Sequence, residues 1–381
     1  MRSTGTYASV TTAGERVRAF VPKPLPPARP RLDEGAYESV AGTAEQALSR
    51  LAAVAGLVPS VDWLLYSAIR KEALLTSQIE GTQATLTDLF DDEAGLAVAN
   101  TDDVEEVSNY LRAFRLVRDN LRRPRGLPIS VRLLCNAHRE LLAGVRGTGK
   151  QPGDLRRLQN WIGGSRPGNA VFVPPPAEQV PALLADLERF IHDRNPGLPP
   201  LVRVALVHVQ FETIHPFLDS NGRIGRLLIA ALLEEWKLLP EPLMYLSGTL
   251  KRHQGEYYRR LSAVRTDGDW EGWVGFFLGA VEEAAAEAEH AIVAIATLVN
   301  ADRRRLLAAP RVGAVALRLF ETLPVMPRFT IEQVRQKLAT TFPTATSAVK
   351  LLEDLGVVTE LTGQKTNRSF SYQAYVELLS R

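Results

Sequence analysis

The chain has 381 residues, a length that predicts about two to three domains. Its 45 Lys and Arg against 43 Asp and Glu leave a net charge of +2, so no strong overall field favours nucleic acid or an anionic membrane. Hydrophobic residues make up 45% and charged residues 23%, which is typical of a soluble globular protein and excludes wholesale disorder.

Cysteine content and hydropathy narrow the class of protein further. The single cysteine, Cys135, excludes an internal disulfide and every multi-cysteine metal centre. No apolar run approaches the ~18 residues that a membrane-spanning helix needs, and the N-terminus lacks the apolar stretch of a secretory signal. We therefore expect a cytoplasmic protein with no membrane partner.

In chain order, residues 1–35 are rich in Pro, Arg and Gly and predict an extended N-terminal arm. Apolar residues at three- and four-residue spacings then predict helices over most of the chain up to residue 308. We divide this part into an N-terminal helical region, 36–105, and a larger helical domain, 106–308. The fold class is therefore mainly α.

Residues 159–176 interrupt the helical pattern. Two short β-type runs flank a turn rich in Gly, Ser, Pro and Asn, and three prolines end the segment. Because a lone hairpin among helices is marginally stable, we expect it to lie over another feature as a flap.

Residues 309–381 predict a further domain of three helices and a β-ribbon, which is a winged-helix pattern. From Arg311 to the C-terminus there are nine Lys and Arg and six Asp and Glu. The expected recognition helix offers Lys350 and several Thr and Ser, whereas major-groove readers bring more Arg, Lys, Asn or Gln. We favour docking of this domain onto protein and leave DNA binding open.

The segment 215–226, His-Pro-Phe-Leu-Asp-Ser-Asn-Gly-Arg-Ile-Gly-Arg, lies between two apolar helices. Pro216 ends the first helix at His215, and turn residues start the second. Free N–H groups at a helix start bind anions, and Arg223 and Arg226 lie three apart on one face of that helix. Two guanidinium groups over exposed amides suit a polyphosphate.

Two more side chains of this segment supply chemistry. Asp219 is the type of ligand that holds Mg²⁺ between phosphates, and His215 is a base with a pKa near neutrality. Together these groups predict phosphoryl or nucleotidyl transfer. The structural alternative, a helix-connecting turn with solvated arginines, stays open at this point because short motifs also occur by chance.

The same segment resembles the signature of the Fic domain family, His-x-Phe-x-(Asp/Glu)-Gly-Asn-Gly-Arg-x-x-Arg, except that Ser220 replaces a glycine. Residues 153–176 resemble the family's target-binding flap, and residues 255–277 resemble the helical region after its motif. Thr76–Gly81 resembles its inhibitory motif, (Ser/Thr)-x-x-x-Glu-(Gly/Asn). The likeness implies a Fic-type helical bundle with a small β-hairpin flap, followed by a C-terminal winged-helix domain.

The resemblance implies a protein adenylyltransferase that moves AMP from ATP to a Ser, Thr or Tyr hydroxyl of a target protein. His215 would be the general base and Asp219 the Mg²⁺ ligand, with Arg223 on the β-phosphate and Arg226 on the γ-phosphate. The phosphates would be cradled by residues of the second helix start, with Asn221 on the α-phosphate: Ser220, Asn221, Gly222, Ile224 and Gly225.

Other roles follow from the same likeness. Tyr257 would lie near the nucleoside, although a core position suits it equally, and the flap 159–176 would hold a target segment by strand addition. Ser220 costs free energy if its φ is positive, but serine is also a good helix cap, so we expect the site to survive. Glu80 would pair with Arg226 at the γ-phosphate position, which implies self-inhibition.

Several alternatives stay open. The same scaffold suits an AMP-removing enzyme or a phosphotransferase, and a DNA-binding regulator that only senses nucleotide is the third class. Self-modification and a homodimer are further expectations about partners. His208 lacks a third ligand at zinc-like spacing, so it is predicted to be a core residue, and Cys135 to be an inert buried thiol.

Overall fold

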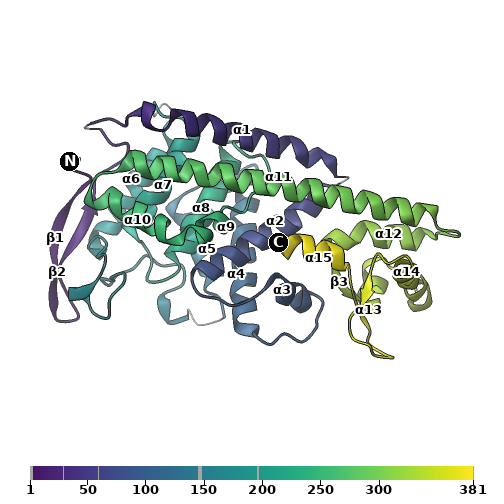
Figure 1. Ribbon diagram of the computed structural model, residues 1–381. Coiled ribbons are helices and arrows are strands. Elements are labelled where there is room, and N and C mark those ends of the chain that lie inside the picture. Colours follow the sequence, from purple (N-terminus) through teal and green to yellow (C-terminus); the bar gives the residue numbers. More distant parts are fainter. Residues whose placement is uncertain (1–2, 29, 59, 145–147, 195–196, 381) are drawn as a thin grey trace.

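The computed structural model describes residues 3–28, 30–58, 60–144, 148–194 and 197–380, and it is mainly helical, as predicted (Figure 1). The predicted arm and tail include residues 1–2, 29 and 381, which lie outside this range. Up to residue 308 the helices are α1 (Glu38–Val54), α2 (Val61–Ile79), α3 (Leu86–Glu93), α4 (Thr101–Arg122), α5 (Val131–Leu141), α6 (Val180–His192), α7 (Pro200–Ile214), α8 (Asn221–Glu235), α9 (Leu246–Arg252), α10 (Gln254–Thr266) and α11 (Trp270–Ala308).

Helix α7 lies at the centre of the core. Every residue from Leu201 to Ile214 is buried, because the helix packs against α6, α8, α10 and α11. Its polar side chains are enclosed as well, including His208 and Glu212. The loop that begins at His215 is therefore positioned by the most deeply buried helix of the molecule.

Helix α11 runs along the whole molecule, and α1 packs along it (Figure 1). Its 39 residues correspond to a length of roughly 58 Å at the usual helical rise. Its apolar positions alternate with many glutamates, and among the described residues no helix is long and apolar enough to cross a membrane. Helix α11 also contacts α15, so it connects the large helical part of the chain to its C-terminal part.

The N-terminal arm is extended, but it also pairs with itself. Strands β1 (Gly5–Thr12) and β2 (Glu15–Pro22) form an antiparallel hairpin along their full length. Ala13 and Gly14 at the turn both have positive φ, as the tight turns that favour hairpins require. The β-branched and aromatic residues of these strands favour strand pairing, and most of the prolines that predicted an unpaired arm follow the hairpin.

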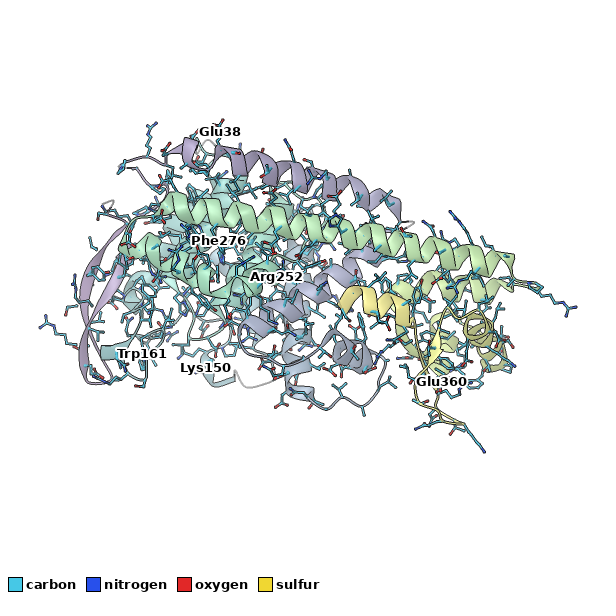
Figure 2. The ribbon with its side chains drawn as sticks, viewed as in Figure 1. Glu38, Lys150, Trp161, Arg252, Phe276 and Glu360 are labelled. Carbon is cyan, nitrogen blue, oxygen red and sulfur yellow. The ribbon has the colours of Figure 1, made fainter. Side chains whose placement is uncertain are left out.

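The predicted flap hairpin is reduced to a single antiparallel bridge between Ile162 and Phe172. The prolines that follow cannot donate to a ladder, which limits its length. The flap instead contacts the N-terminal hairpin: the Phe20 amide donates to the Val173 carbonyl oxygen at 2.9 Å, and Arg166 pairs with Glu15 at 2.5 Å. Figure 2 shows Trp161 of the flap near β1 and β2.

The C-terminal part is consistent with the predicted winged helix. It contains α12 (Ala314–Thr322), α13 (Ile331–Lys337), α14 (Phe342–Asp354) and a sheet of β3 (Arg328–Thr330), β5 (Ser369–Ser371) and β4 (Thr359–Glu360), in that order. Strand β3 and the last helix, α15 (Gln373–Ser380), were not predicted.

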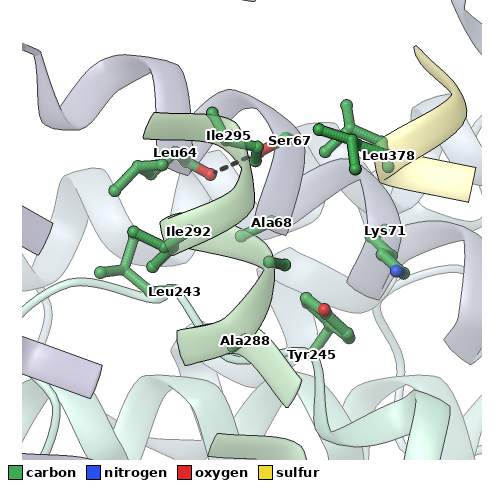
Figure 3. A pocket seen from close by; sticks show the side chains of 12 residues that line it. Leu64, Ser67, Ala68, Lys71, Leu243, Tyr245, Ala288, Ile292, Ile295 and Leu378 are labelled. Carbon is green, nitrogen blue, oxygen red and sulfur yellow. Dashed lines mark hydrogen bonds between the residues drawn. The ribbon is translucent and has the colours of Figure 1, made fainter. Parts of the chain in front are cut away.

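Helix α15 returns to the large helical part of the chain. Leu378 of α15 lies near Leu64 and Ala68 of α2, with Ile292 and Ile295 of α11 lining the same small gap (Figure 3). The C-terminal part therefore packs against α2, the helix whose end carries Glu80.

Candidate active site

A tight loop joins α7 to α8 and carries the predicted signature. His215 and Ser220 both have left-handed backbone, with φ of 50° and 61°. Arg156, which is 2% exposed, braces the loop: its Nε donates to the His215 carbonyl oxygen at 2.8 Å and its Nη2 to that of Pro175 at 2.6 Å. A buried guanidinium group thus fixes the loop to the end of the flap.

Asn221 closes the loop from inside. Its Oδ1 accepts from the Phe217 amide at 2.8 Å and its Nδ2 donates to the Phe217 carbonyl oxygen at 2.9 Å. The Phe217 ring stacks on His138 at 4.0 Å. Both polar atoms of the Asn221 side chain are therefore committed to the loop in this structure, whereas the resemblance gave that side chain to the α-phosphate.

The start of α8 offers free amides. The amides of Asn221, Gly222 and Arg223 precede the first helical hydrogen bond, so they have no partner within the helix. The next amide, that of Ile224, already donates to the Ser220 carbonyl oxygen at 3.0 Å, and the Ile224 side chain is fully buried. Three amides without a helical partner therefore lie at the start of α8, the kind of position at which anions bind.

Ser220 does not cap α8, so the expectation of a serine cap is wrong. Capping serines have β-region backbone, whereas Ser220 is left-handed. Its hydroxyl instead accepts from Arg223 Nη2 at 2.7 Å and donates to Asp219 Oδ1 at 3.3 Å. The serine therefore links the loop carboxylate to the first arginine of the signature.

Arg226 is held by the end of α2. Its side chain is 2% exposed, and its Nε donates to Thr76 Oγ1 at 2.6 Å while its Nη2 donates to Glu80 Oε1 at 2.5 Å. Burial alone would raise the pKa of Glu80, but the charge and hydrogen bond of Arg226 outweigh it and lower that pKa. The pair is therefore ionised at neutral pH, and the contact implied by the resemblance is present.

Arg223 is buried, whereas Asp219 of the neighbouring loop is accessible. Arg223 Nη1 donates to Glu106 of α4 at 3.2 Å, and the Asp219 side chain is 44% exposed. The described residues contain no group of three or more His, Cys, Asp or Glu that could hold a metal ion. A single accessible carboxylate fits Mg²⁺ that takes its other ligands from phosphates and water, the usual arrangement for this ion.

His215 is enclosed and uncharged at neutral pH. Burial, and then the nearby charge of Arg156, lower the pKa of His215 to about 4. Its Nδ1 is buried without a hydrogen-bond partner among the described residues. A neutral imidazole with an unpartnered nitrogen is the protonation state that a general base requires.

A cavity of about 350 Å³ lies beside His215. Its walls come from the signature, α7, α10 and the flap, with these residues: Glu80, Ile162, Gly163, Val171, Phe172, Glu212, His215, Gly222, Arg226, Tyr257, Tyr258, Leu261, Ser262 and Arg265. The fold thus brings four of the predicted site residues to one cavity: Glu80, His215, Gly222 and Arg226. This is the arrangement expected of residues that share a ligand.

Tyr257 is both a wall of this cavity and a core residue. It is 1% exposed, and its hydroxyl lies 2.8 Å from His208 Nε2. Because His208 Nδ1 faces the Gly225 carbonyl oxygen, which only accepts, Nδ1 carries the proton and Nε2 accepts from Tyr257. Burial lowers the pKa of His208 to about 3, so it is a satisfied neutral core histidine, as predicted.

Sequence reasoning missed four residues that shape the site: Glu106, Arg156, Glu212 and Arg265. Arg156 stood inside a stretch that the resemblance had singled out. No sequence motif points to Glu106, Glu212 or Arg265, because their roles depend on which helices pack together.

Two protein families match this chain. Residues 39–119 match the family described as Fic/DOC family N-terminal, and residues 128–233 match the Fic/DOC family itself. The chain belongs to the Fic/DOC family. The matched ranges of this Fic/DOC protein contain Glu80, the loop and the whole signature.

Relatives of known name and structure agree with this assignment. The chain is 26% identical over 212 residues to protein adenylyltransferase Fic of Drosophila ananassae and 28% identical over 158 residues to that of Drosophila grimshawi. These matches cover 55% and 41% of this chain but only 39% and 29% of the relatives.

Solved structures share the fold. A Fic family protein from Desulfovibrio desulfuricans G20 superposes with a TM-score of 0.58 and 22% identity, over 90% of this chain and 97% of that one. Fic-1 from C. elegans gives a TM-score of 0.52 and 19% identity, over 68% and 72% of the two chains. The Fic-type helical fold of this protein is thereby confirmed.

Proposed function

We propose that this Fic/DOC protein transfers AMP from ATP to a Ser, Thr or Tyr hydroxyl of a target protein, and that Glu80 restrains the reaction. The observation that carries the proposal is the buried Glu80–Arg226 pair beside the three free amides of α8. An anion cradle whose second arginine is occupied by the chain's own carboxylate suits a restrained phosphate site. The names of the Drosophila relatives support the same class of reaction.

In the proposed step the target hydroxyl oxygen bonds to the α-phosphorus, the bond from that phosphorus to the β-bridging oxygen breaks, and pyrophosphate leaves. His215, neutral at pH 7, takes the hydroxyl proton. The free amides of α8 and the guanidinium groups of Arg223 and Arg226 stabilise the charge on the phosphates. Mg²⁺, held by Asp219, would neutralise part of that charge when bound.

The restraint follows from where Glu80 lies. A Cβ atom on Gly222 would lie 2.4 Å from Glu80 Oε1, so the carboxylate sits directly against the start of α8. While Glu80 holds Arg226, that arginine is not free for a γ-phosphate, and the carboxylate repels one. ATP would then bind in a pose unfit for in-line attack.

The target segment is proposed to lie along the flap, 159–176. One side of the flap strand is partly taken by β2 through the Phe20–Val173 hydrogen bond. A target strand would therefore add on the side of Ile162, using main-chain hydrogen bonds that tolerate varied sequences. The same mode suits a segment of this chain, which would give self-modification.

The test compares wild type, Glu80→Gly and His215→Ala after incubation with ATP labelled at the α- or the γ-phosphate. We expect Glu80→Gly to incorporate α-label into protein at least about 10-fold faster than wild type, because Arg226 is released. His215→Ala in the Glu80→Gly protein should abolish incorporation while leaving ATP affinity within about threefold.

Each alternative gives a different label pattern. Transfer of γ-label without α-label would indicate a phosphotransferase, and loss of AMP from a pre-labelled target would indicate AMP removal. Salt-dependent DNA binding without any transfer would favour a regulator. Equal α-labelling by wild type and Glu80→Gly would contradict the inhibitory role of Glu80.

A further inference from the structure

Glu212 has a buried carboxyl group with one unpartnered oxygen among the described residues, and it lines the cavity beside His215. The residue is 9% exposed, and its Oε1 has no hydrogen-bond partner among the described residues. Burial is the largest influence and raises the pKa of Glu212 to about 7, although Arg226 opposes it. Buried carboxyl groups normally have partners, so this one requires an explanation.

Arg265 is a largely buried cation that lines the same cavity. It comes from α10, its guanidinium carbon stacks 3.9 Å from the centre of the Phe172 ring of the flap, and it donates to Ser262 Oγ at 3.3 Å. Burial lowers the pKa of Arg265 to about 10, and the charge of Glu212 opposes that shift. The two groups therefore influence each other electrostatically, yet no ion pair joins them in the part of the chain that the structure describes.

The Glu212 carboxyl group fits into a space that a glycine of α8 leaves open. A Cβ atom on Gly225 would lie 2.3 Å from Glu212 Oε1 and 3.2 Å from the His208 ring. Gly225 thus leaves room for Glu212 between α7 and α8. The glycine keeps the carboxyl group at the cavity wall, one helical turn before His215.

The chemistry of the ligand decides what Glu212 binds. The phosphates of a nucleoside triphosphate offer hydrogen-bond acceptors and negative charge, both of which a carboxylate repels. Hydrogen-bond donors occur only on the nucleoside, at the sugar hydroxyls and at exocyclic or ring N–H groups of the base. An acidic side chain that accepts from a ribose hydroxyl is a well-known solution in nucleotide sites.

We propose that Glu212 is a nucleoside-specificity residue, which accepts a hydrogen bond from an N–H or O–H donor of the bound nucleotide in the cavity that Arg265 also lines. This inference rests on the proposed function, because it takes the cavity to be the nucleotide site. It assigns to Glu212 the choice among nucleotides, and to His215 and the signature the transfer itself.

The experiment measures nucleotide binding by calorimetry, so it does not depend on transfer. The full-length Glu80→Gly protein is titrated with ATP, 2′-deoxy-ATP, 3′-deoxy-ATP and purine riboside triphosphate, which lacks the adenine amino group. We expect one of the three analogues to bind about 10-fold or more weakly than ATP, because a charged hydrogen bond is lost. The analogue affected identifies the donor as a sugar hydroxyl or the base amine.

The matched variant is Glu80→Gly with Glu212→Gln, which keeps the shape and removes the charge. In it the ratio between ATP and the affected analogue should fall to about threefold or less. Uniform affinity for all four nucleotides in the Glu80→Gly protein would overturn the proposal without any Glu212 variant, and so would an unchanged ratio in the double variant. Failure of the Glu80→Gly protein to bind any nucleotide would instead contradict the proposed function.

Discussion

Two carboxyl groups pack against glycines of helix α8, and they differ in whether an arginine pairs with them. Glu80 from α2 lies against Gly222 and is paired with Arg226, whereas Glu212 from α7 lies against Gly225 with Oε1 unpartnered. At each glycine a carboxylate oxygen lies within 2.4 Å of the place that a Cβ atom would take. The paired group has a lowered pKa and the unpaired group a raised one, because only the first has a cation in hydrogen-bond contact.

This difference matches the two proposed roles, in which Glu80 restrains the transfer and Glu212 recognises the nucleotide. Glu80 already has its partner, so releasing it changes what Arg226 can bind. Glu212 Oε1 has no hydrogen-bond partner among the described residues, and we propose that a ligand supplies one. The first two predictions below test that separation, beginning with the larger expected effect, and the third tests the backbone at the start of α8.

The contributions of the two carboxyl groups to stability should change in opposite directions as pH rises. The native state keeps Glu212 protonated above its ordinary pKa of 4.5, so its contribution to stability is present below pH 4.5 and is lost as pH rises to about 7. Relative to Glu212→Gln, wild type should lose roughly 3 kcal/mol of unfolding free energy over that range. Urea denaturation of both proteins between pH 4.5 and 8 measures the difference.

Glu80→Gln is the control for this titration. Because the pKa of Glu80 is lowered, its contribution is present above its ordinary pKa of 4.5 and is lost as pH falls below that value. The stability difference between wild type and Glu80→Gln should therefore grow with pH. If both variants followed wild type in parallel at every pH, the contrast between the two groups would be wrong.

Alanine at the two glycines should have unequal effects. In Gly225→Ala the new methyl group meets Glu212 and the His208 ring inside the core, so we expect a loss of about 1–3 kcal/mol. In Gly222→Ala it meets the end of the Glu80 side chain, which can turn away, so the change should stay below about 1 kcal/mol.

Urea denaturation at pH 7 measures both alanine variants. Their order matters more than either value, because helix propensity favours alanine equally at the two positions. Equal losses would mean that Glu80 is as firmly packed as Glu212, and the comparison would lose its basis.

The last prediction concerns Ser220, which precedes the first residue of α8 and has φ of 61°. Glycine adopts this conformation without cost, whereas Ser220→Ala keeps the left-handed cost and loses the bond to Arg223. Ser220→Gly should therefore exceed Ser220→Ala in stability by about 1–2 kcal/mol, measured by thermal unfolding. An alanine variant as stable as the glycine variant would contradict the left-handed backbone.

The sequence predicted those parts of the site that are contiguous in the chain. His215, Asp219 and the two arginines lie in one loop and one helix turn, so spacing alone brings them together. Glu80 was reached through a motif, and its contact with Arg226 is present. The sequence did not predict that the Asn221 side chain bonds within the loop or that the Ile224 amide donates to Ser220, because both bonds depend on the folded loop.

The rest of the site depends on packing that leaves no periodic pattern. Helix α7 is buried on every side, so nothing in its sequence distinguishes Glu212, which faces a cavity, from Gln210 or His208. The N-terminal hairpin was not predicted, because the composition of residues 1–35 averages the alternating β-branched residues of its strands with the prolines that follow them. Helix α15 and strand β3 were missed because eight and three residues are too short for a clear period.

The length of α11 has a consequence for anyone who divides this protein into parts. Near its C-terminal end, Asp302 is 1% exposed and accepts a hydrogen bond at 2.7 Å from the Tyr372 hydroxyl of the C-terminal part. Leu306 nearby is fully buried. A chain cut at residue 308 would expose these side chains to water, so the two parts share a stability that neither fragment inherits intact.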